Sequence, residues 1–204
     1  MIYEMRTYTL RAGSVPEFER RFGAAIPHRE KYSPLAAFWH TEIGPLNQVI
    51  HVWPYADLNE RARIRAEAMK DPNWPPKTSE LIVAQEAKLL TPAPFSLPLD
   101  PRDDGPIYEI RTYDIQPGMI PKMVEAFAAA IPNRIKRSPL VGAFFTEFGP
   151  LNQWVHIWVY RSLDERGRIR AEAMNDATWP PKAQEIEWRM ESKIVLPASF
   201  SKLR

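Results

Sequence analysis

The pattern of apolar and polar positions predicts four strands and two helices in the first half of the chain. Residues 2–10 alternate between the two kinds of position and are rich in β-branched and aromatic side chains, which is typical of a strand. Further strands are expected at residues 36–43, 48–55 and 85–91, and residues 44–47 (Gly-Pro-Leu-Asn) predict a hairpin between the first two of these. Phe18, Phe22 and Ile26 recur every four residues and predict a helix with one apolar face.

Local signals place the ends of the helices. Ser14 followed by Glu17 predicts a capping box at the start of the first helix, and Pro27 is expected to kink or end that helix. Asp57 with Glu60 predicts the start of the second helix in the same way.

The second half of the chain repeats the first. A shift of 105 residues aligns residues 3–96 with residues 108–201 without a gap, and 49 of the 94 pairs are identical. Identity of this extent indicates the duplication of one domain. Residues 97–106 are rich in Pro, Asp and Gly, so we expect domains at residues 1–96 and 107–204 joined by an exposed linker.

The order strand, helix, strand, strand, helix, strand is that of the ferredoxin-like fold. A four-stranded antiparallel sheet with both helices on one face leaves its other face bare, and that face must pack on something. The second copy is the obvious cover. The sequence therefore predicts an α+β protein in which two tandem ferredoxin-like βαββαβ domains form a dimeric α/β barrel within one chain.

Composition narrows the classes of function. The 204 residues contain 27 Lys and Arg against 25 Asp and Glu, and this net charge of +2 does not indicate a nucleic-acid-binding surface. There is no cysteine, which excludes disulfides, thiol nucleophiles and cysteine metal ligands. No apolar run approaches the ~18 residues of a membrane span, and the first residues do not resemble a signal peptide. We expect a cytoplasmic protein without nucleic-acid or membrane partners.

Several motifs recur in both halves in the same order. They are YE-[MI]-RTY at the start, TE-x-GPLN in the hairpin, H-x-W-x-Y in the next strand, ER-x-RIRAEAM in the second helix, D-x-x-W after it and PA-x-FS at the end. In the order and spacing of these motifs the chain resembles the NIPSNAP family over nearly everything outside the linker. The resemblance implies a dimeric α/β-barrel fold and brings no established catalytic mechanism. Relatives on this barrel include cofactor-free monooxygenases, haem-degrading enzymes and ring-modifying enzymes, which is an analogy at the level of the fold.

The strand at residues 48–55 has two faces. Ile50 and Val52 share one face, whereas His51, Trp53 and Tyr55 share the other. The aliphatic face is expected against the helices, so the histidine face would turn into the barrel interior together with polar residues of the first strand. The candidate ligand-binding residues are Glu4, Arg6, Tyr8, His51, Trp53 and Tyr55, with Glu109, Arg111, Tyr113, His156, Trp158 and Tyr160 at the matching positions of the second half.

These residue types suit a pocket for a small, partly apolar molecule. His51 is a candidate general base, and Arg6 is a candidate partner for a carboxylate or a developing anion. A structural alternative stays open, in which Glu4 and Arg6 form a cross-strand salt bridge and the histidine donates one hydrogen bond to the backbone. His51 and His156 are also candidate haem ligands, but one such histidine per domain is a weak signal for haem. No carboxylate and histidine cluster has metal-ligand spacing, so we expect no cofactor and no metal.

Two other features are more typical of structure than of chemistry. Arg61 and Arg65 share one side of the second helix and are expected on a solvated face. Trp74 and Trp179 stand in Trp-Pro-Pro corners that lead into a short helical stretch, and both are expected to anchor packing.

Two functions of different class remain. The first is binding of a small, partly apolar molecule in the barrel interior, with cofactor-free enzymatic chemistry as an extension. The second is a non-catalytic protein-interaction or assembly module. A buried cavity lined by polar groups would favour binding, whereas a collapsed interior with an apolar outer patch would favour assembly. Edge strands with unpaired backbone groups make a homodimer a further expectation.

Overall fold

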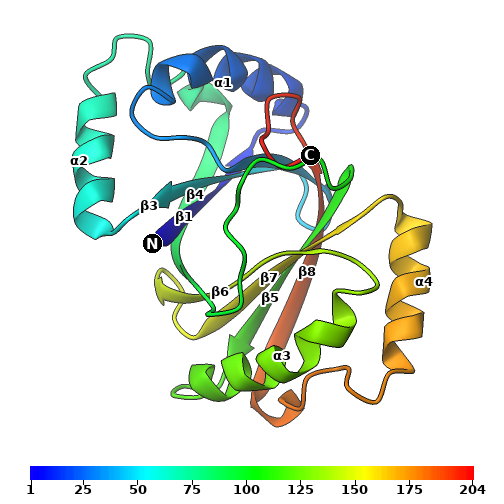
Figure 1. The fold of residues 1–204 in the computed structure, drawn as a ribbon. Coiled ribbons are helices and arrows are strands. Elements are labelled where there is room, and N and C mark those ends of the chain that lie inside the picture. The colour runs from blue at the N-terminus through cyan, green and yellow to red at the C-terminus, as the bar shows by residue number, and fades with distance from the viewer.

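The computed structural model describes residues 1–204 and contains two copies of the unit expected from the sequence (Figure 1). The first copy consists of β1 (Ile2–Leu10), α1 (Val15–Arg29), β2 (Ala37–Ile43), β3 (Gln48–Tyr55), α2 (Leu58–Ala68), the short 3-10 helix η1 (Ser79–Leu81) and β4 (Ile82–Pro92). The second consists of β5 (Ile107–Ile115), α3 (Ile120–Arg134), β6 (Leu140–Phe148), β7 (Gln153–Tyr160), α4 (Leu163–Met174), η2 (Gln184–Ile186) and β8 (Glu187–Pro197). None of these helices is long and apolar enough to cross a membrane.

The eight strands close into one antiparallel barrel in the order β1-β3-β2-β8-β5-β7-β6-β4. Each half forms a four-stranded sheet, and the halves join at two seams, where β2 pairs with β8 and β4 pairs with β6. Helices α1 and α2 lie outside the first half of the barrel, and α3 and α4 lie outside the second (Figure 1). The expected dimeric α/β barrel within one chain is confirmed.

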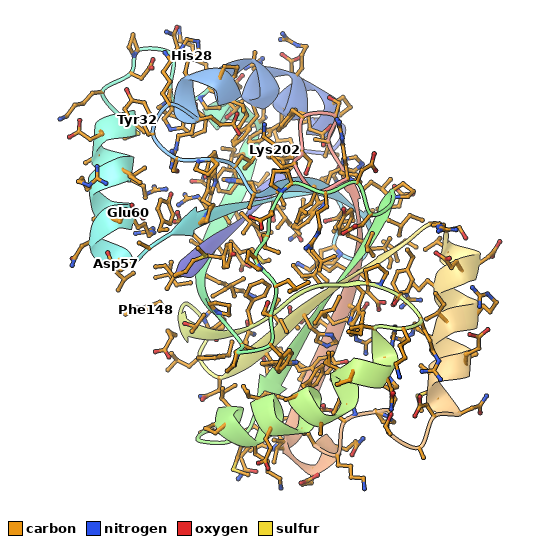
Figure 2. All side chains as sticks on the ribbon, viewed as in Figure 1. His28, Tyr32, Asp57, Glu60, Phe148 and Lys202 are labelled. Atoms are coloured by element: carbon orange, nitrogen blue, oxygen red, sulfur yellow. The ribbon has the colours of Figure 1, made fainter.

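The barrel interior is a packed apolar core to which both halves contribute. Tyr3 of β1 meets Phe144 of β6 edge to face with 5.4 Å between ring centroids, and Trp39 of β2 lies 5.3 Å from Tyr108 of β5. Aliphatic side chains of β3 and β7, Ile50 among them, belong to the same cluster. Side chains fill the space between the two sheets (Figure 2), so the inner faces stabilise the pairing of the two copies through apolar burial.

The histidine face of β3 lies against the helices, which is the reverse of the expected assignment. His51 packs on Phe22 of α1 with 5.1 Å between ring centroids, and Trp53 belongs to the same helix-side cluster. The alternation correctly predicts which residues share a face, but a period of two does not say which face is inside. The placement of the candidate residues in the barrel interior is therefore wrong. The physical reason is that Glu4 and its neighbours need charged partners, which the helices supply and the apolar opposite sheet does not.

The predicted start of α2 is confirmed, whereas the capping box of α1 is wrong. The side chain of Asp57 accepts a hydrogen bond of 2.8 Å from the backbone N–H of Glu60, and both lie at the start of α2 (Figure 2). Ser14 is the N-cap residue of α1, but its side chain makes no capping hydrogen bond. The carboxylate of Glu17 turns outward instead and accepts hydrogen bonds from arginines of the next turn.

Helix α1 continues through Pro27 rather than ending there. Phe22 and Ile26 are buried before the proline and Arg29 is buried after it, so the helix keeps one face in contact with the sheet on both sides. The packing of this face offsets the local cost of a proline inside a helix, which is ~3 kcal/mol.

The linker is more buried than expected. Leu99 is only 5% exposed and belongs to the barrel core, and its backbone N–H donates to the Tyr3 hydroxyl at 3.1 Å. Arg102 forms an isolated bridge to Leu203 near the C-terminus. The expectation of an exposed linker is therefore wrong at these residues, because the barrel core extends to the linker and needs apolar cover there.

The two seams leave few unpaired strand edges, and such edges were the basis for expecting a homodimer. The outer strands of each sheet pair with the other copy, so they are not free edges over their full length. β4 pairs with β6 only from Leu89 onward, and β8 pairs with β2 only from Ile194 onward. The first parts of β4 and β8 thus keep one unpaired edge, and the homodimer stays a prediction.

Candidate functional site

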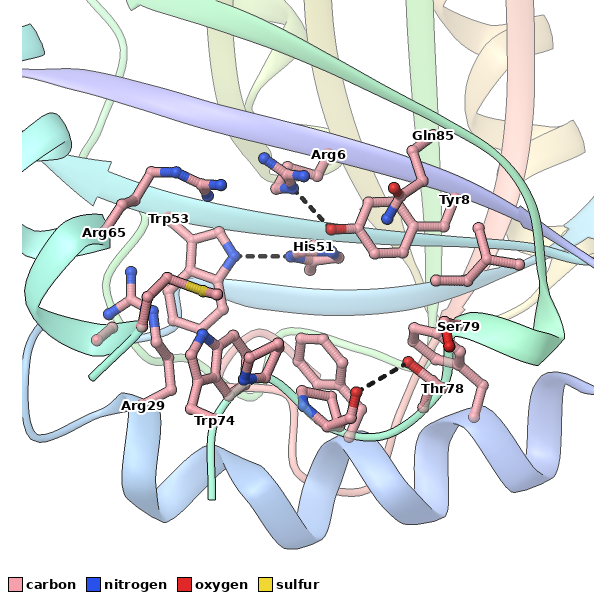
Figure 3. Close-up of a pocket in the computed structure, with 17 residues that line it drawn as sticks. Arg6, Tyr8, Arg29, His51, Trp53, Arg65, Trp74, Thr78, Ser79 and Gln85 are labelled. Carbon is pink, nitrogen blue, oxygen red and sulfur yellow. Dashed lines mark hydrogen bonds between the residues drawn. The ribbon is translucent and has the colours of Figure 1, made fainter. Parts of the chain in front are cut away.

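Each half of the chain has a pocket between its helices and the outer face of its sheet. The first pocket, in the first half, encloses about 310 Å³. Its polar lining consists of Arg6, Tyr8, Arg29, His51, Trp53, Arg65, Trp74, Thr78, Ser79 and Gln85 (Figure 3). Its apolar lining includes Phe18, Phe22, Met69, Pro75, Pro76 and Ile82. The pocket therefore joins strands β1, β3 and β4 to α1, the end of α2 and the corner that follows it.

The Trp-Pro-Pro corner forms one wall of the first pocket. The ring of Trp74 packs edge to face on Phe22 at 5.5 Å and on Trp53 at 6.2 Å, which agrees with a packing anchor. The same ring also faces the pocket and the guanidinium of Arg29, so it contributes to the site as well. The short helical stretch expected after the corner is η1.

A buried carboxylate beneath the pocket gathers three arginines. Glu4 is fully buried, and its carboxylate accepts hydrogen bonds from Arg6 at 2.9 Å, Arg61 at 2.5 Å and Arg65 at 3.4 Å. Burial alone would raise the pKa of Glu4, but the hydrogen bond from Arg61 and the charges of Arg65 and Arg6 outweigh it and lower that pKa. Glu4 is thus ionised at neutral pH and holds α2 to β1.

Arg29, near the end of α1, lines the pocket without a carboxylate partner. Its side chain is buried, with 3% of the residue exposed, and it donates to the hydroxyls of Ser33 at 2.8 Å and Tyr55 at 3.0 Å. The guanidinium stacks over Trp53 at 4.4 Å and near Trp74 at 5.9 Å, so cation–π contacts compensate part of its charge. Burial and the positive charge of Arg65 lower the pKa of Arg29.

His51 sits in the middle of the lining residues, between Trp53 and Tyr8 (Figure 3). The indole N–H of Trp53 donates to Nδ1 of His51 at 2.7 Å, and because an indole nitrogen can only donate, Nδ1 carries no proton. Burial, together with the charges of Arg6, Arg65 and Arg29, holds the pKa of His51 well below its usual range. The imidazole is therefore neutral with its proton on Nε2. That buried Nε2 has no hydrogen-bond partner.

The second pocket, in the second half, encloses about 360 Å³ and repeats this arrangement. Glu109 accepts from Arg166 at 2.7 Å and from Arg111 at 3.0 Å, and Arg134 again has no carboxylate partner. Trp158 donates to Nδ1 of His156 at 2.6 Å, and Nε2 of His156 is buried without a partner. The same network has thus formed twice.

The two pockets differ in their walls. Glu187 lines the second pocket where Ile82 lines the first, and Met190 stands where the first pocket has Gln85. Burial raises the pKa of Glu187, although the charge of Arg111 opposes the change. The second pocket therefore has one more ionisable carboxyl group than the first.

The structure brings the six predicted residues of each half together, but outside the barrel. Of the first-half set, Arg6, Tyr8, His51 and Trp53 line the first pocket, while Glu4 lies beneath it. Tyr55 does not line the pocket; it holds Arg29 through its hydroxyl. In the second half Arg111, Tyr113, His156 and Trp158 line the pocket, Glu109 lies beneath it and Tyr160 holds Arg134. Their role toward a ligand stays a prediction.

Sequence reasoning missed Arg29 and misplaced Arg65. Arg29 follows Phe18, Phe22 and Ile26 at the spacing of one helix face, so a single cation in a buried apolar stripe was the signal that could have revealed it. Arg61 and Arg65 were expected on a solvated face, yet both turn toward Glu4. The i, i+4 spacing correctly predicts that the two arginines share one side of α2. It does not reveal their partner, because Glu4 belongs to β1, which is distant in sequence.

The arrangement decides what the histidines can do. A neutral imidazole whose Nδ1 already accepts from an indole and whose Nε2 carries the proton can act only as a hydrogen-bond donor through Nε2. The general-base role expected for His51 does not fit this protonation state. Donation to the backbone does not fit either, because Nε2 has no hydrogen-bond partner. The structure gathers no group of three or more His, Cys, Asp or Glu side chains that could hold a metal ion.

Fold and site together define a dimeric α/β barrel built within one chain, with two helix-side pockets. The family model NIPSNAP matches residues 3–97 and again residues 108–202, and the chain belongs to the NIPSNAP family. The chain is 31% identical to "Protein NipSnap homolog" of Dictyostelium discoideum over 98% of its length and 88% of that protein's length. It is 28% identical to "Protein NipSnap homolog 3A" of Homo sapiens over its full length and 86% of the human protein.

Two solved structures are similar to this chain to different extents. An uncharacterised NIPSNAP domain protein from Burkholderia xenovorans is 35% identical and covers 48% of this chain and 99% of its own, with a TM-score of 0.45. A structure described as a putative monooxygenase from Fusobacterium nucleatum covers 97% of this chain and 92% of its own, with a TM-score of 0.69 and 8% identity. At that identity the second likeness concerns the fold alone.

Proposed function

We propose that each half of the chain binds one small, partly apolar molecule in its helix-side pocket. The observation that carries this proposal is that His51 lines a pocket while its buried Nε2 has no hydrogen-bond partner. Buried polar groups in proteins are nearly always paired, so an unpaired donor beside a pocket calls for an acceptor on a ligand. His156 repeats the same feature in the second pocket.

The walls support the same proposal. Aromatic rings and prolines form much of the lining, and a few polar groups converge on the pocket, which is the usual construction of a small-molecule site. About 310 Å³ lies at the lower end of the range for such sites. The ligand is therefore small, with an apolar part and at least one acceptor atom.

Native mass spectrometry of the purified chain tests the proposal, with crystallographic density in the pockets as a second readout. The double variant His51→Asn, His156→Asn can retain an acceptor for each tryptophan N–H and removes each Nε2 donor, so it should lose the bound mass, and circular dichroism checks that it keeps the wild-type fold. His40→Asn is the matched control, because His40 bonds Glu19 and does not line a pocket. Retention of the same mass by the double variant would contradict the proposal.

Cofactor-free enzymatic chemistry is favoured by one feature of the second pocket. The guanidinium of Arg134 and the neutral imidazole of His156 can stabilise negative charge that develops on a ligand oxygen. Glu187 adds a carboxyl group whose raised pKa suits proton transfer. Incubation of the retained molecule with the protein in D2O tests this extension. Deuterium should enter the ligand with the wild type and fail to enter it with Glu187→Gln, whereas the absence of exchange in both leaves the pocket as a binding site.

Assembly with another protein is the second candidate function. The packed barrel interior and two exposed apolar side chains of β8, Trp188 at 63% and Met190 at 56% exposure, favour it. These two side chains share one face of the strand by its period of two. Light scattering of the wild type and of Trp188→Ser should show whether a dimer or larger assembly forms and whether this face carries it.

A further inference from the structure

The charges around the first pocket do not balance. Arg6, Arg61 and Arg65 share the single carboxylate of Glu4, and Arg29 has no carboxylate at all. The side chains of Arg61 and Arg65 are 26% and 40% exposed, so water compensates part of their charge. Arg29 is buried, and a buried charge without a counter-charge is strongly unfavourable. Four arginines and one carboxylate leave an excess of three positive charges, and the part of this excess that neither a carboxylate nor water compensates lies at Arg29.

The hydrogen-bonding groups that face the pocket point to the same partner. Nε2 of His51 is a donor, and the Arg29 guanidinium has five N–H groups, of which two are used by Ser33 and Tyr55. A ligand that satisfies both residues must bring acceptor atoms. A planar guanidinium fork pairs with two oxygens of one acidic group.

We propose that the pockets are sites for small carboxylic acids, bound as carboxylates by Arg29 and His51 in the first half and by Arg134 and His156 in the second. This inference rests on the proposed function and names the class of its ligand. The apolar part of the acid lies against the aromatic rings and prolines of the corner. One buried uncompensated guanidinium matches one negative charge, which a carboxylate carries at neutral pH, whereas a phosphate monoester carries close to two.

The second half has the same donors. Arg134 donates to the hydroxyls of Ser138 at 2.7 Å and Tyr160 at 3.2 Å and stacks over Trp158 at 4.2 Å. The second pocket also contains Glu187, whose carboxyl group opposes an incoming anion when it is ionised. The structure thus predicts two carboxylate sites, of which the first binds more tightly.

Calorimetric titration of the full chain with benzoate, benzamide and phenyl phosphate tests the ligand class. Benzamide has the same ring and nearly the same shape as benzoate without the charge. Benzoate should bind at two sites, and benzamide about tenfold or more weakly, because a hydrogen bond to a charged group contributes more than one to a neutral group. This comparison needs no variant. Equal or tighter binding of benzamide would overturn the carboxylate assignment, and tighter binding of phenyl phosphate would replace it with a phosphate ester.

Arginine variants locate the two sites. Arg29→Gln should leave one benzoate site, Arg134→Gln should leave one, and the double variant should leave none. Arg63→Gln is the matched control, because Arg63 lies on α2 with 66% of its side chain exposed and should leave both sites intact. Two sites in the double variant would overturn the assignment of the arginines.

Failure of this inference is distinguishable from failure of the proposed function. A neutral molecule retained in native mass spectrometry and lost in His51→Asn, His156→Asn would keep the pockets as binding sites and overturn the carboxylate class. No retained mass, together with no binding of any of the three probes, would overturn both.

Discussion

Replacement of Glu109 by Gln should cost the folded state ~3 kcal/mol at neutral pH. Glu109 is fully buried, and three arginines and Ser192 surround its carboxylate. Burial raises its pKa, but hydrogen bonds from Arg166 and Ser192 and the charge of Arg111 outweigh burial and lower the pKa from 4.5 to about 2. A carboxyl group with this difference between the unfolded and folded states stabilises the folded state by ~3 kcal/mol above pH 4.5.

The sign of the pH dependence follows from the lowered pKa. The contribution of Glu109 is complete above the unfolded pKa of 4.5 and is lost as the pH falls toward about 2, at about 1.4 kcal/mol for each pH unit. Urea unfolding of the wild type and Glu109→Gln at pH 7, 5, 4 and 3 should therefore show a gap that is widest at pH 7 and narrows below pH 4.5. Glu125→Gln, at an exposed position of α3, is the control and should show almost no gap.

Two results would refute this reasoning. A gap that stays constant with pH would mean that the introduced amide disturbs packing rather than charge. A gap below about 1 kcal/mol at pH 7 would place the Glu109 cluster among solvent-screened ion pairs, whose contributions are that small.

Three further predictions follow from the helix-side pockets. Phe22→Ala should lower the free energy of unfolding by ~3–5 kcal/mol in urea, because Phe22 is a buried member of the α1 face, and an unchanged stability would contradict its packing. Nitrogen-15 NMR should show His51 and His156 as neutral Nε2–H tautomers from pH 5 to 8, whereas His40 should titrate above its usual pKa because of its hydrogen bond to Glu19. Glu187→Ile should strengthen benzoate binding in the second pocket to about the affinity of the first pocket. Calorimetric titration in the Arg29→Gln background, where only the second site remains, measures this affinity, and an unchanged value would show that Glu187 does not act on the ligand.

Local periodicity was sufficient to predict most of the fold. The alternation in β1 and β3 and the four-residue repeat in α1 placed these elements, and the internal duplication supplied the cover for the bare sheet faces. Ser14 failed as a capping residue because the carboxylate expected to complete the box pairs with neighbouring arginines. Pro27 failed as a helix end because the buried contacts of α1 outweigh a local preference.

The identity of the site residues was easier to predict than their location. Shared faces follow from the period of two, so His51, Trp53 and Glu4 were correctly grouped. Which face turns inward depends on partners that lie far apart in sequence: the barrel interior is filled by apolar side chains of both halves, and the charged residues find Arg61 and Arg65 only on the helix side. The tautomer of His51 depends on a single hydrogen bond from Trp53, which no sequence pattern reveals.

A comparison of the two pockets of the duplicated chain bears on which ligands they accept. About half of the paired positions of the two halves differ, so the copies have had room to change. The polar groups that anchor the pockets are nevertheless the same in both halves, namely Glu4, Arg6, Tyr8, Arg29, His51, Trp53, Arg61, Arg65 and Trp74 with their counterparts. The walls differ on the side of the short 3-10 helix and the strand that follows it, where Ser79, Ile82 and Gln85 of the first pocket correspond to Gln184, Glu187 and Met190 of the second. Phe22, Met69 and the Trp-Pro-Pro corner are the same in both pockets. In a symmetric homodimer both pockets would have to change together, whereas in a fused chain each can change alone. Shared anchors and a shared corner, with one side that differs, are the pattern expected if both pockets hold the same acidic group and accept ligands that differ where they meet this side.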